Sequence, residues 1–126
     1  FRCTELNLGE FIRRQDIIYV GGGNTANLLA VWRLHGLDRV LRKAYAEGTV
    51  LSGISAGAAC WFESCLTDSF GRLEALNDGL GILPGSFCPH FNTELGRPRS
   101  FFADTTKRYF TARGSFRRWG GSSILQ

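Results

Sequence analysis

The stretch TVLSGISAGAAC, residues 49–60, sets the fold because a short apolar run leads directly into small residues around one serine. Ser55 stands at the centre of a G-x-S-x-G pentapeptide, between Gly53 and Gly57. Small residues here let the chain turn sharply from a strand into a helix, and the turn lifts the hydroxyl to the carboxyl end of a sheet. The pattern predicts a nucleophile elbow, with an ordinary structural serine as the alternative.

The residues on either side of this stretch follow alternating strand and helix patterns. QDIIYVGGGN predicts a buried strand over residues 16–20 that ends in a glycine loop. Two helices should follow, one capped by Asn24 or Thr25 and broken at Gly36, the other ending at Gly48. TVLSGI then predicts a second strand and SAGAACWFESC a third helix. This order indicates an α/β fold, a parallel sheet flanked by helices.

Composition and charge limit the classes of protein to which the chain can belong. Its 126 residues are 44% apolar, enough for one modest globular domain, and no apolar run reaches the roughly 20 residues of a membrane span. Residues 1–96 carry 8 basic and 10 acidic residues, whereas residues 97–126 carry 7 basic and one acidic. Aromatic residues interleaved with the bases also fit a nucleic-acid-binding module. A charged chain end is the commoner meaning, so nucleic acid and membrane are not expected partners.

The cysteines and histidines do not have the spacing of metal ligands. The four cysteines include no C-x-x-C pair, and neither histidine has a second one nearby, so we expect no metal. No secretion signal precedes the domain, so Cys60, Cys65 and Cys88 are expected to be reduced and unbridged, as in a cytoplasmic protein.

A nucleophilic serine needs a base, and the chain holds two histidines. His35 falls at the end of a predicted helix, where a solvated residue is the simplest role. His90 follows Pro89 in SFCPHFN, which favours an extended backbone, so it should project from the end of another strand as a general base. A core histidine with satisfied hydrogen bonds is the alternative.

The triple glycine in GGGNTAN can be interpreted in two ways. It has neither the G-x-G-x-x-G spacing nor the Gly-Lys-Ser/Thr ending of a phosphate-binding loop, so a nucleotide cofactor is not favoured. A loop of bare backbone N–H groups better suits a second donor of an oxyanion hole, with the N–H of Ala56 as the first.

Three segments, DIIYVGGGNTANLL, GISAGAACWFESCLTDSFG and LGILPGSFCPHFN, together resemble the aspartyl dipeptidase (peptidase E) family of serine peptidases, relatives of cyanophycinase. The resemblance covers about residues 9–96. It implies an α/β domain similar to class I glutamine amidotransferases, cytoplasmic, free of cofactor, and cleaving short peptides. Carried over by position, it makes Ser55 the nucleophile and His90 the base, and it places Gly23 beside Ala56 in the oxyanion hole.

The chain also departs from the family pattern. Strands that precede the glycine loop in the family have no counterpart, so we expect an incomplete sheet whose open edge favours homo-oligomers. The predicted organisation is a partial peptidase domain over residues 1–96 and a basic tail over residues 97–126 that does not match the family. The family's downstream glutamate has no counterpart either, so Asp68, ahead of Glu94, is the candidate that orients His90.

These departures keep other functions open. A non-catalytic fragment or an interaction module that retains the peptidase fold is the main alternative to a serine peptidase. An esterase of the α/β-hydrolase type shares the pentapeptide, but it needs an acid between serine and histidine and normally a longer chain. We expect weak dipeptidase activity, or none, from residues 1–126.

Overall fold

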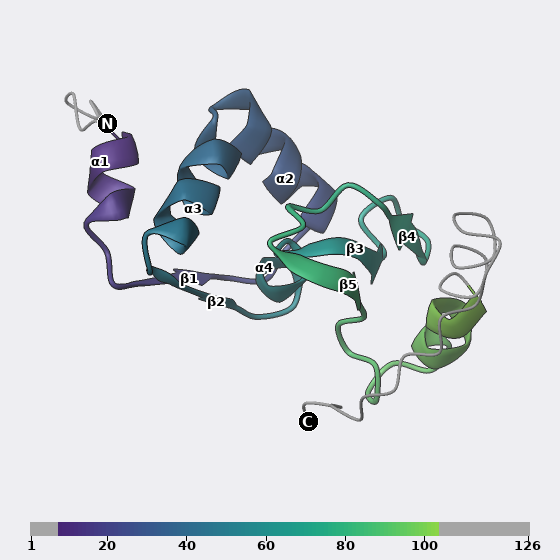
Figure 1. Cartoon of the computed structure of the whole chain (residues 1–126). Helices are drawn as coiled ribbons and strands as arrows, with labels where there is room; N and C mark the ends of the chain where they lie inside the picture. Colours follow the sequence, from purple (N-terminus) through teal and green to yellow (C-terminus); the bar gives the residue numbers. More distant parts are fainter. Residues whose placement is uncertain (1–7, 104–126) are drawn as a thin grey trace, which may run out of the picture.

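The structure is a computed structural model that describes residues 8–103 as a mixed α/β arrangement with two small sheets (Figure 1). In chain order the elements are α1 (Leu8–Arg13), β1 (Ile17–Val20), α2 (Thr25–Leu34), α3 (Leu37–Ala46), β2 (Val50–Gly53), α4 (Ala56–Ala59), β3 (Phe62–Thr67), β4 (Glu74–Leu76) and β5 (Leu83–Phe87). Residues 97–103 are also helical. None of the helices in this described part combines the length and apolarity that a membrane span requires.

The first sheet is the parallel pair of β1 and β2, in register from Ile17 opposite Val50. Helices α2 and α3 connect the two strands and lie on one side of them (Figure 1). On that side Ile18 and Leu51 pack against the core, whereas Ile17, Tyr19 and Val50 are exposed. The strands therefore alternate between a packed and an exposed face.

The core lies between the helices and the start of the second sheet. Its buried members come from α2, α3, the residues directly after α4 and the loop before β5: Leu29, Trp32, Leu41, Cys60, Trp61 and Leu80. The rings of Trp32 and Trp61 are tilted at 33° with centroids 5.6 Å apart, a favourable aromatic arrangement. Helix α4 contacts β1, β2 and β3, so it joins the two sheets.

The second sheet places β3 in the centre, antiparallel to β4 and parallel to β5. The segment SAGAACWFESC is predicted to form one helix, and this prediction is wrong for its second half. The helix ends at Ala59, and β3 begins at Phe62. The physical reason is long-range pairing, because the carbonyl of Phe62 accepts the N–H of Gly81 and that of Glu63 the N–H of Gly79. The local spacing of apolar residues does not reveal such distant partners.

Most of the other predicted elements are confirmed, except that the first strand, predicted to be buried, has one exposed face. Strands occur at residues 17–20 and 50–53, Asn24 caps α2, and Gly36 separates α2 from α3 with φ +69°. The α/β class is confirmed, but within residues 8–103 the expected single parallel sheet is a parallel pair and a separate mixed sheet. Most of the predicted basic tail, residues 104–126, lies outside the described residues.

Candidate active site

Ser55 lies in a sharp turn between β2 and α4, as the pentapeptide predicts. Its backbone has φ +53° and ψ −116°, a conformation that residues with a side chain rarely adopt. A backbone of this kind costs of order 1–3 kcal/mol and occurs mostly where function requires it. The strain at Ser55 therefore supports a functional rather than a structural serine.

The glycines on both sides of Ser55 are required by close backbone contacts. A Cβ on Gly53 would lie 2.2 Å from the carbonyl oxygen of Gly57, and a Cβ on Gly57 would lie 2.2 Å from that of Val20. The same Val20 oxygen accepts the N–H of Ile54 at 3.1 Å. The elbow thus packs directly against the end of β1, with no space for side chains between the two backbones.

The glycine loop after β1 lies beside the serine. A Cβ on Gly22 would be 3.5 Å from Cβ of Ser55, and the adjacent Gly23 has φ +142°. Neither the N–H of Gly23 nor that of Ala56, the first residue of α4, donates a hydrogen bond to another residue in the range 8–103. Both predicted oxyanion donors are therefore still available for a ligand.

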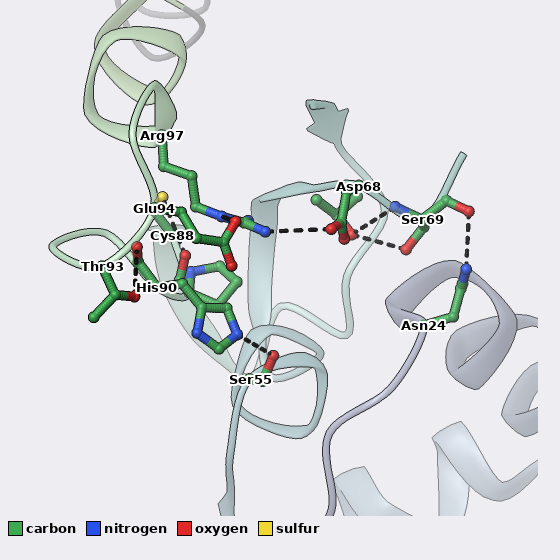
Figure 2. A network of polar contacts seen from close by, with 11 residues as sticks. Asn24, Ser55, Asp68, Ser69, Cys88, His90, Thr93, Glu94 and Arg97 are labelled. Carbon is green, nitrogen blue, oxygen red and sulfur yellow. Dashed lines mark hydrogen bonds and ion pairs between the residues drawn. The ribbon is translucent and has the colours of Figure 1, made fainter. Parts of the chain in front are cut away.

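His90 lies three residues beyond β5 and points at the serine (Figure 2). Its Nε2 is 2.9 Å from Oγ of Ser55, and both side chains remain accessible to solvent. The backbone of His90 is left-handed, with φ +57°, and this corrects the extended conformation predicted from the preceding proline, because His90 lies in a turn beyond β5. The other histidine, His35, is exposed at the end of α2, as its position in the sequence predicts.

Neither candidate for the orienting acid contacts the imidazole. Asp68 directly follows β3, and its Oδ2 lies 3.4 Å from Nη2 of Arg97. Glu94 places Oε2 2.6 Å from Nε of the same arginine (Figure 2). No residue of the described chain forms a hydrogen bond with Nδ1 of His90. The orienting role of Asp68 therefore remains a prediction without a direct contact.

Sequence reasoning missed Arg97, which lies just beyond the predicted family boundary. Its side chain is only 3% exposed, although arginine is almost never buried unless it is paired. The residues around position 97 do not indicate that its side chain is buried and paired, because its partner Asp68 lies 29 residues earlier in the chain.

A second group of polar contacts joins the glycine loop to the end of β3. Nδ2 of Asn24 donates to the carbonyl of Ser69 at 2.8 Å, and Oγ of Ser69 accepts the N–H of Ala26 at 3.2 Å. Oδ1 of Asn24 meanwhile accepts the N–H of Asn27 at 2.9 Å and caps α2. One asparagine thus anchors both α2 and the loop after β3.

The three cysteines within residues 8–103 do not take part in this site. Cys60, Cys65 and Cys88 are free thiols, and Cys3 lies outside the described residues. Burial raises the pKa of Cys60 to about 12 and the pKa of Cys65 to about 11, so both thiols stay protonated and unreactive at neutral pH. Within residues 8–103, no three His, Cys, Asp or Glu side chains gather closely enough to hold a metal ion.

A serine hydroxyl within hydrogen-bond reach of an imidazole is the arrangement that activates a nucleophile. The imidazole can take the hydroxyl proton, and backbone N–H groups beside the serine can face a developing oxyanion. The geometry is therefore suited to acyl transfer at a carbonyl carbon.

Comparisons with known proteins identify the family of the chain. The sequence profile of Peptidase family S51 matches residues 3–116. The chain belongs to this family. It is 53% identical over 97 residues to the uncharacterized peptidase YgaJ of Bacillus subtilis, a match that covers 77% of this chain and 42% of that protein. It is 35% identical over 88 residues to Peptidase E of Salmonella arizonae, covering 68% of this chain and 38% of that enzyme.

A third relative, Peptidase E of Pasteurella multocida, is 36% identical over 84 residues, which are 65% of this chain and 36% of that protein. The chain spans less than half the length of each of these relatives. The family match also includes residues 97–116, beyond the boundary that the sequence patterns suggest at residue 96. That boundary stays a prediction.

Proposed function

We propose that this chain carries the nucleophile and the base of a serine-type peptidase that hydrolyses short peptides. The observation that carries the proposal is the 2.9 Å contact between Oγ of Ser55 and Nε2 of His90, at a strained strand-to-helix turn. Membership in Peptidase family S51 and the name Peptidase E of two relatives support the reaction class.

In the proposed reaction, Nε2 of His90 accepts the hydroxyl proton while Oγ of Ser55 attacks the scissile carbonyl carbon. This requires the neutral tautomer of His90 with its proton on Nδ1. The N–H groups of Gly23 and Ala56 stabilise the charge that develops on the carbonyl oxygen, and one such donor is typically worth about 3 kcal/mol. His90 then protonates the leaving amine, and a water molecule, deprotonated by the same imidazole, hydrolyses the acyl-enzyme.

The proposal has further parts that rest on the family resemblance. They are a complete fold similar to class I glutamine amidotransferases, a cytoplasmic location, chemistry without a cofactor, and substrates that are short peptides. Self-association is included, because the exposed side of β1 and β2 carries the apolar side chains of Ile17, Tyr19 and Val50.

The second candidate is a non-catalytic fragment that retains part of the peptidase fold. One observation favours it: Nδ1 of His90 lacks a hydrogen-bond partner within residues 8–103. An unsupported imidazole should transfer protons poorly, so we expect slow peptide turnover even if Ser55 is activated.

A fluorophosphonate probe, which reacts with activated serines, tests the proposal without needing full turnover. Residues 1–126 should be labelled, and Ser55→Ala should abolish the labelling. His90→Gln should slow it by about 100-fold or more, the usual contribution of a general base. Ser52→Ala and His35→Gln are the matched controls and should label like the wild type, because Ser52 bonds the carbonyl of Ile18 within the sheet and His35 is remote.

Labelling that persists in Ser55→Ala would refute the assigned nucleophile. An unlabelled wild-type chain that is folded by circular dichroism would favour the non-catalytic fragment. Release of free amino acids from an Asp-X dipeptide, lost in Ser55→Ala, would extend the proposal to dipeptidase activity.

A further inference from the structure

Arg97 connects the turn that carries His90 to the end of the central strand β3. We propose that Arg97 is a positioning residue that holds His90 against Ser55 through its ion pairs with Glu94 and Asp68. The inference deepens the proposed function and rests on it for the catalytic meaning of the Ser55–His90 contact. It also assigns Asp68 an indirect role, through the arginine, in place of a contact with the imidazole.

The first half of this connection runs from His90 to Arg97. The carbonyl oxygen of His90 accepts the backbone N–H groups of Thr93 and Glu94, each at 3.1 Å. Glu94 then accepts Nε of Arg97 at 2.6 Å, the shortest of the ion pairs in the described chain. The peptide unit of His90 is therefore connected to the guanidinium through Glu94, first by a backbone hydrogen bond and then by an ion pair.

The second half runs from Arg97 to the sheet. Asp68 follows Thr67, the last residue of β3, and accepts Nη2 of Arg97 at 3.4 Å. Strand β3 pairs with β5, which leads directly to His90. The ion pairs close a ring from β3 through β5, the His90 turn and Arg97 back to β3. Figure 2 shows the contact between Arg97 and Asp68. A ring of this kind can hold the left-handed backbone of His90, which would otherwise relax.

The energetics favour positioning over stabilisation as the role of Arg97. The guanidinium is buried, and its Nη1 has no hydrogen-bond partner among the described residues. Its two carboxylate partners are largely exposed, at 66% for Asp68 and 47% for Glu94. Burying a charge this way costs desolvation energy that exposed partners offset only partly. Removing the arginine would leave two solvated carboxylates, so the fold should lose little stability.

The histidine resonances provide a direct test, because the chain has two histidines and His35→Gln leaves His90 alone. The variants Arg97→Met, Arg97→Lys and Arg99→Met would be made in this background with ¹⁵N-labelled histidine. Arg99, exposed and two residues away, is the matched control for loss of charge. Their imidazole ¹⁵N shifts would be followed against pH, together with the rate of fluorophosphonate labelling and thermal unfolding.

We expect Arg97→Met to shift the His90 resonances and to slow labelling by about 10- to 100-fold, because misplacing a catalytic group by 1 Å is costly. Arg97→Lys should recover part of the rate, since an ammonium can still pair with one carboxylate. Arg99→Met should match the parent. If the loss of folding free energy in Arg97→Met is as large as the free energy that corresponds to the slower labelling, Arg97 has a structural role. That result would overturn the proposal.

Unchanged His90 resonances in Arg97→Met would also overturn it. Should Arg97→Met fail to fold, Asp68→Asn and Glu94→Gln each weaken one arm at an exposed carboxylate. Each should then move the same resonances, and unchanged spectra in both would refute the inference. A wild-type chain that is not labelled by the probe would refute the proposed function but not this inference. The His90 resonances would still report whether Arg97 positions His90.

Discussion

The two sides of the Ser55–His90 contact are held in place by different kinds of interaction. On the serine side, bare backbones touch, because Gly53 and Gly57 leave no space for a Cβ between the elbow and β1. On the histidine side, charged side chains make the connection, because the ion pairs of Arg97 join the turn that carries His90 to the end of β3. Close backbone contact demands particular residue types close together in sequence, whereas an ion pair can be formed by any suitable side chains that the fold brings together.

The largest expected effect breaks the serine side. Gly57→Ala would place a Cβ 2.2 Å from the carbonyl oxygen of Val20, and backbone atoms cannot rotate away as a side chain can. We expect the free energy of unfolding in urea to fall by about 3 kcal/mol or more, at the upper end of overpacking effects. Gly21→Ala is the control, because a Cβ there meets nothing within 4 Å. Equal losses in the two variants would contradict the close-contact explanation.

The next effect weakens the histidine side through its central strand. Leu66 on β3 is 2% exposed, so Leu66→Ala should lower the free energy of unfolding by about 2–5 kcal/mol, the cost of a cavity at a buried leucine. Leu34→Ala on α2, where the side chain is 79% exposed, should cost less than about 0.5 kcal/mol. Chemical denaturation measures both, and similar values would show that β3 is not packed as described.

Asn24 links the two sides, and its variants separate its two contacts. Asn24→Ala removes both the cap of α2 and the hydrogen bond to Ser69, and it should cost about 1–2 kcal/mol. Asn24→Ser keeps a capping oxygen and loses only the amide donor, so it should cost less. Thermal unfolding compares the two variants, with exposed Asn27→Ala as a control. If serine is as damaging as alanine, the cap contributes nothing.

The smallest effect concerns pH and the buried thiols. The pKa of Cys60 rises from 9.0 to about 12 because the folded protein buries it. The unfolded chain therefore releases this proton first, so stability is complete below pH 9 and declines as the pH rises toward 12. We expect Cys60 to account for a loss of about 1 kcal/mol at pH 10.

Urea titrations at pH 8 and pH 10 measure this loss, which Cys60→Ala should reduce. Cys88→Ala is the comparison on the histidine side. Burial also raises the pKa of Cys88, but this thiol is only half-buried, so its replacement should change the pH dependence less. If the unfolding free energy of Cys60→Ala falls between pH 8 and pH 10 as much as that of the wild type, the Cys60 thiol is not buried in solution.

The accuracy of the sequence-based predictions follows the same division. Short-range patterns found the strands around residues 17–20 and 50–53, the cap at Asn24 and the break at Gly36. They failed at residues 62–65, where the segment SAGAACWFESC is interpreted as a helix but pairing with β4 and β5 makes a strand. An apolar segment whose spacing fits both a helix and a strand adopts the secondary structure that its distant pairing partners impose.

The sequence by itself determined the elbow, because two glycines around a serine after an apolar strand permit a turn that few other residues could make. It also indicated His90, since one of only two histidines follows a proline at the end of an apolar segment. Only the tertiary structure decided that these side chains meet at 2.9 Å and that Asp68 contacts Arg97 instead of the imidazole. The physical reason is that an ion pair depends on where the fold brings charges together, and residues 29 positions apart carry no local trace of that proximity.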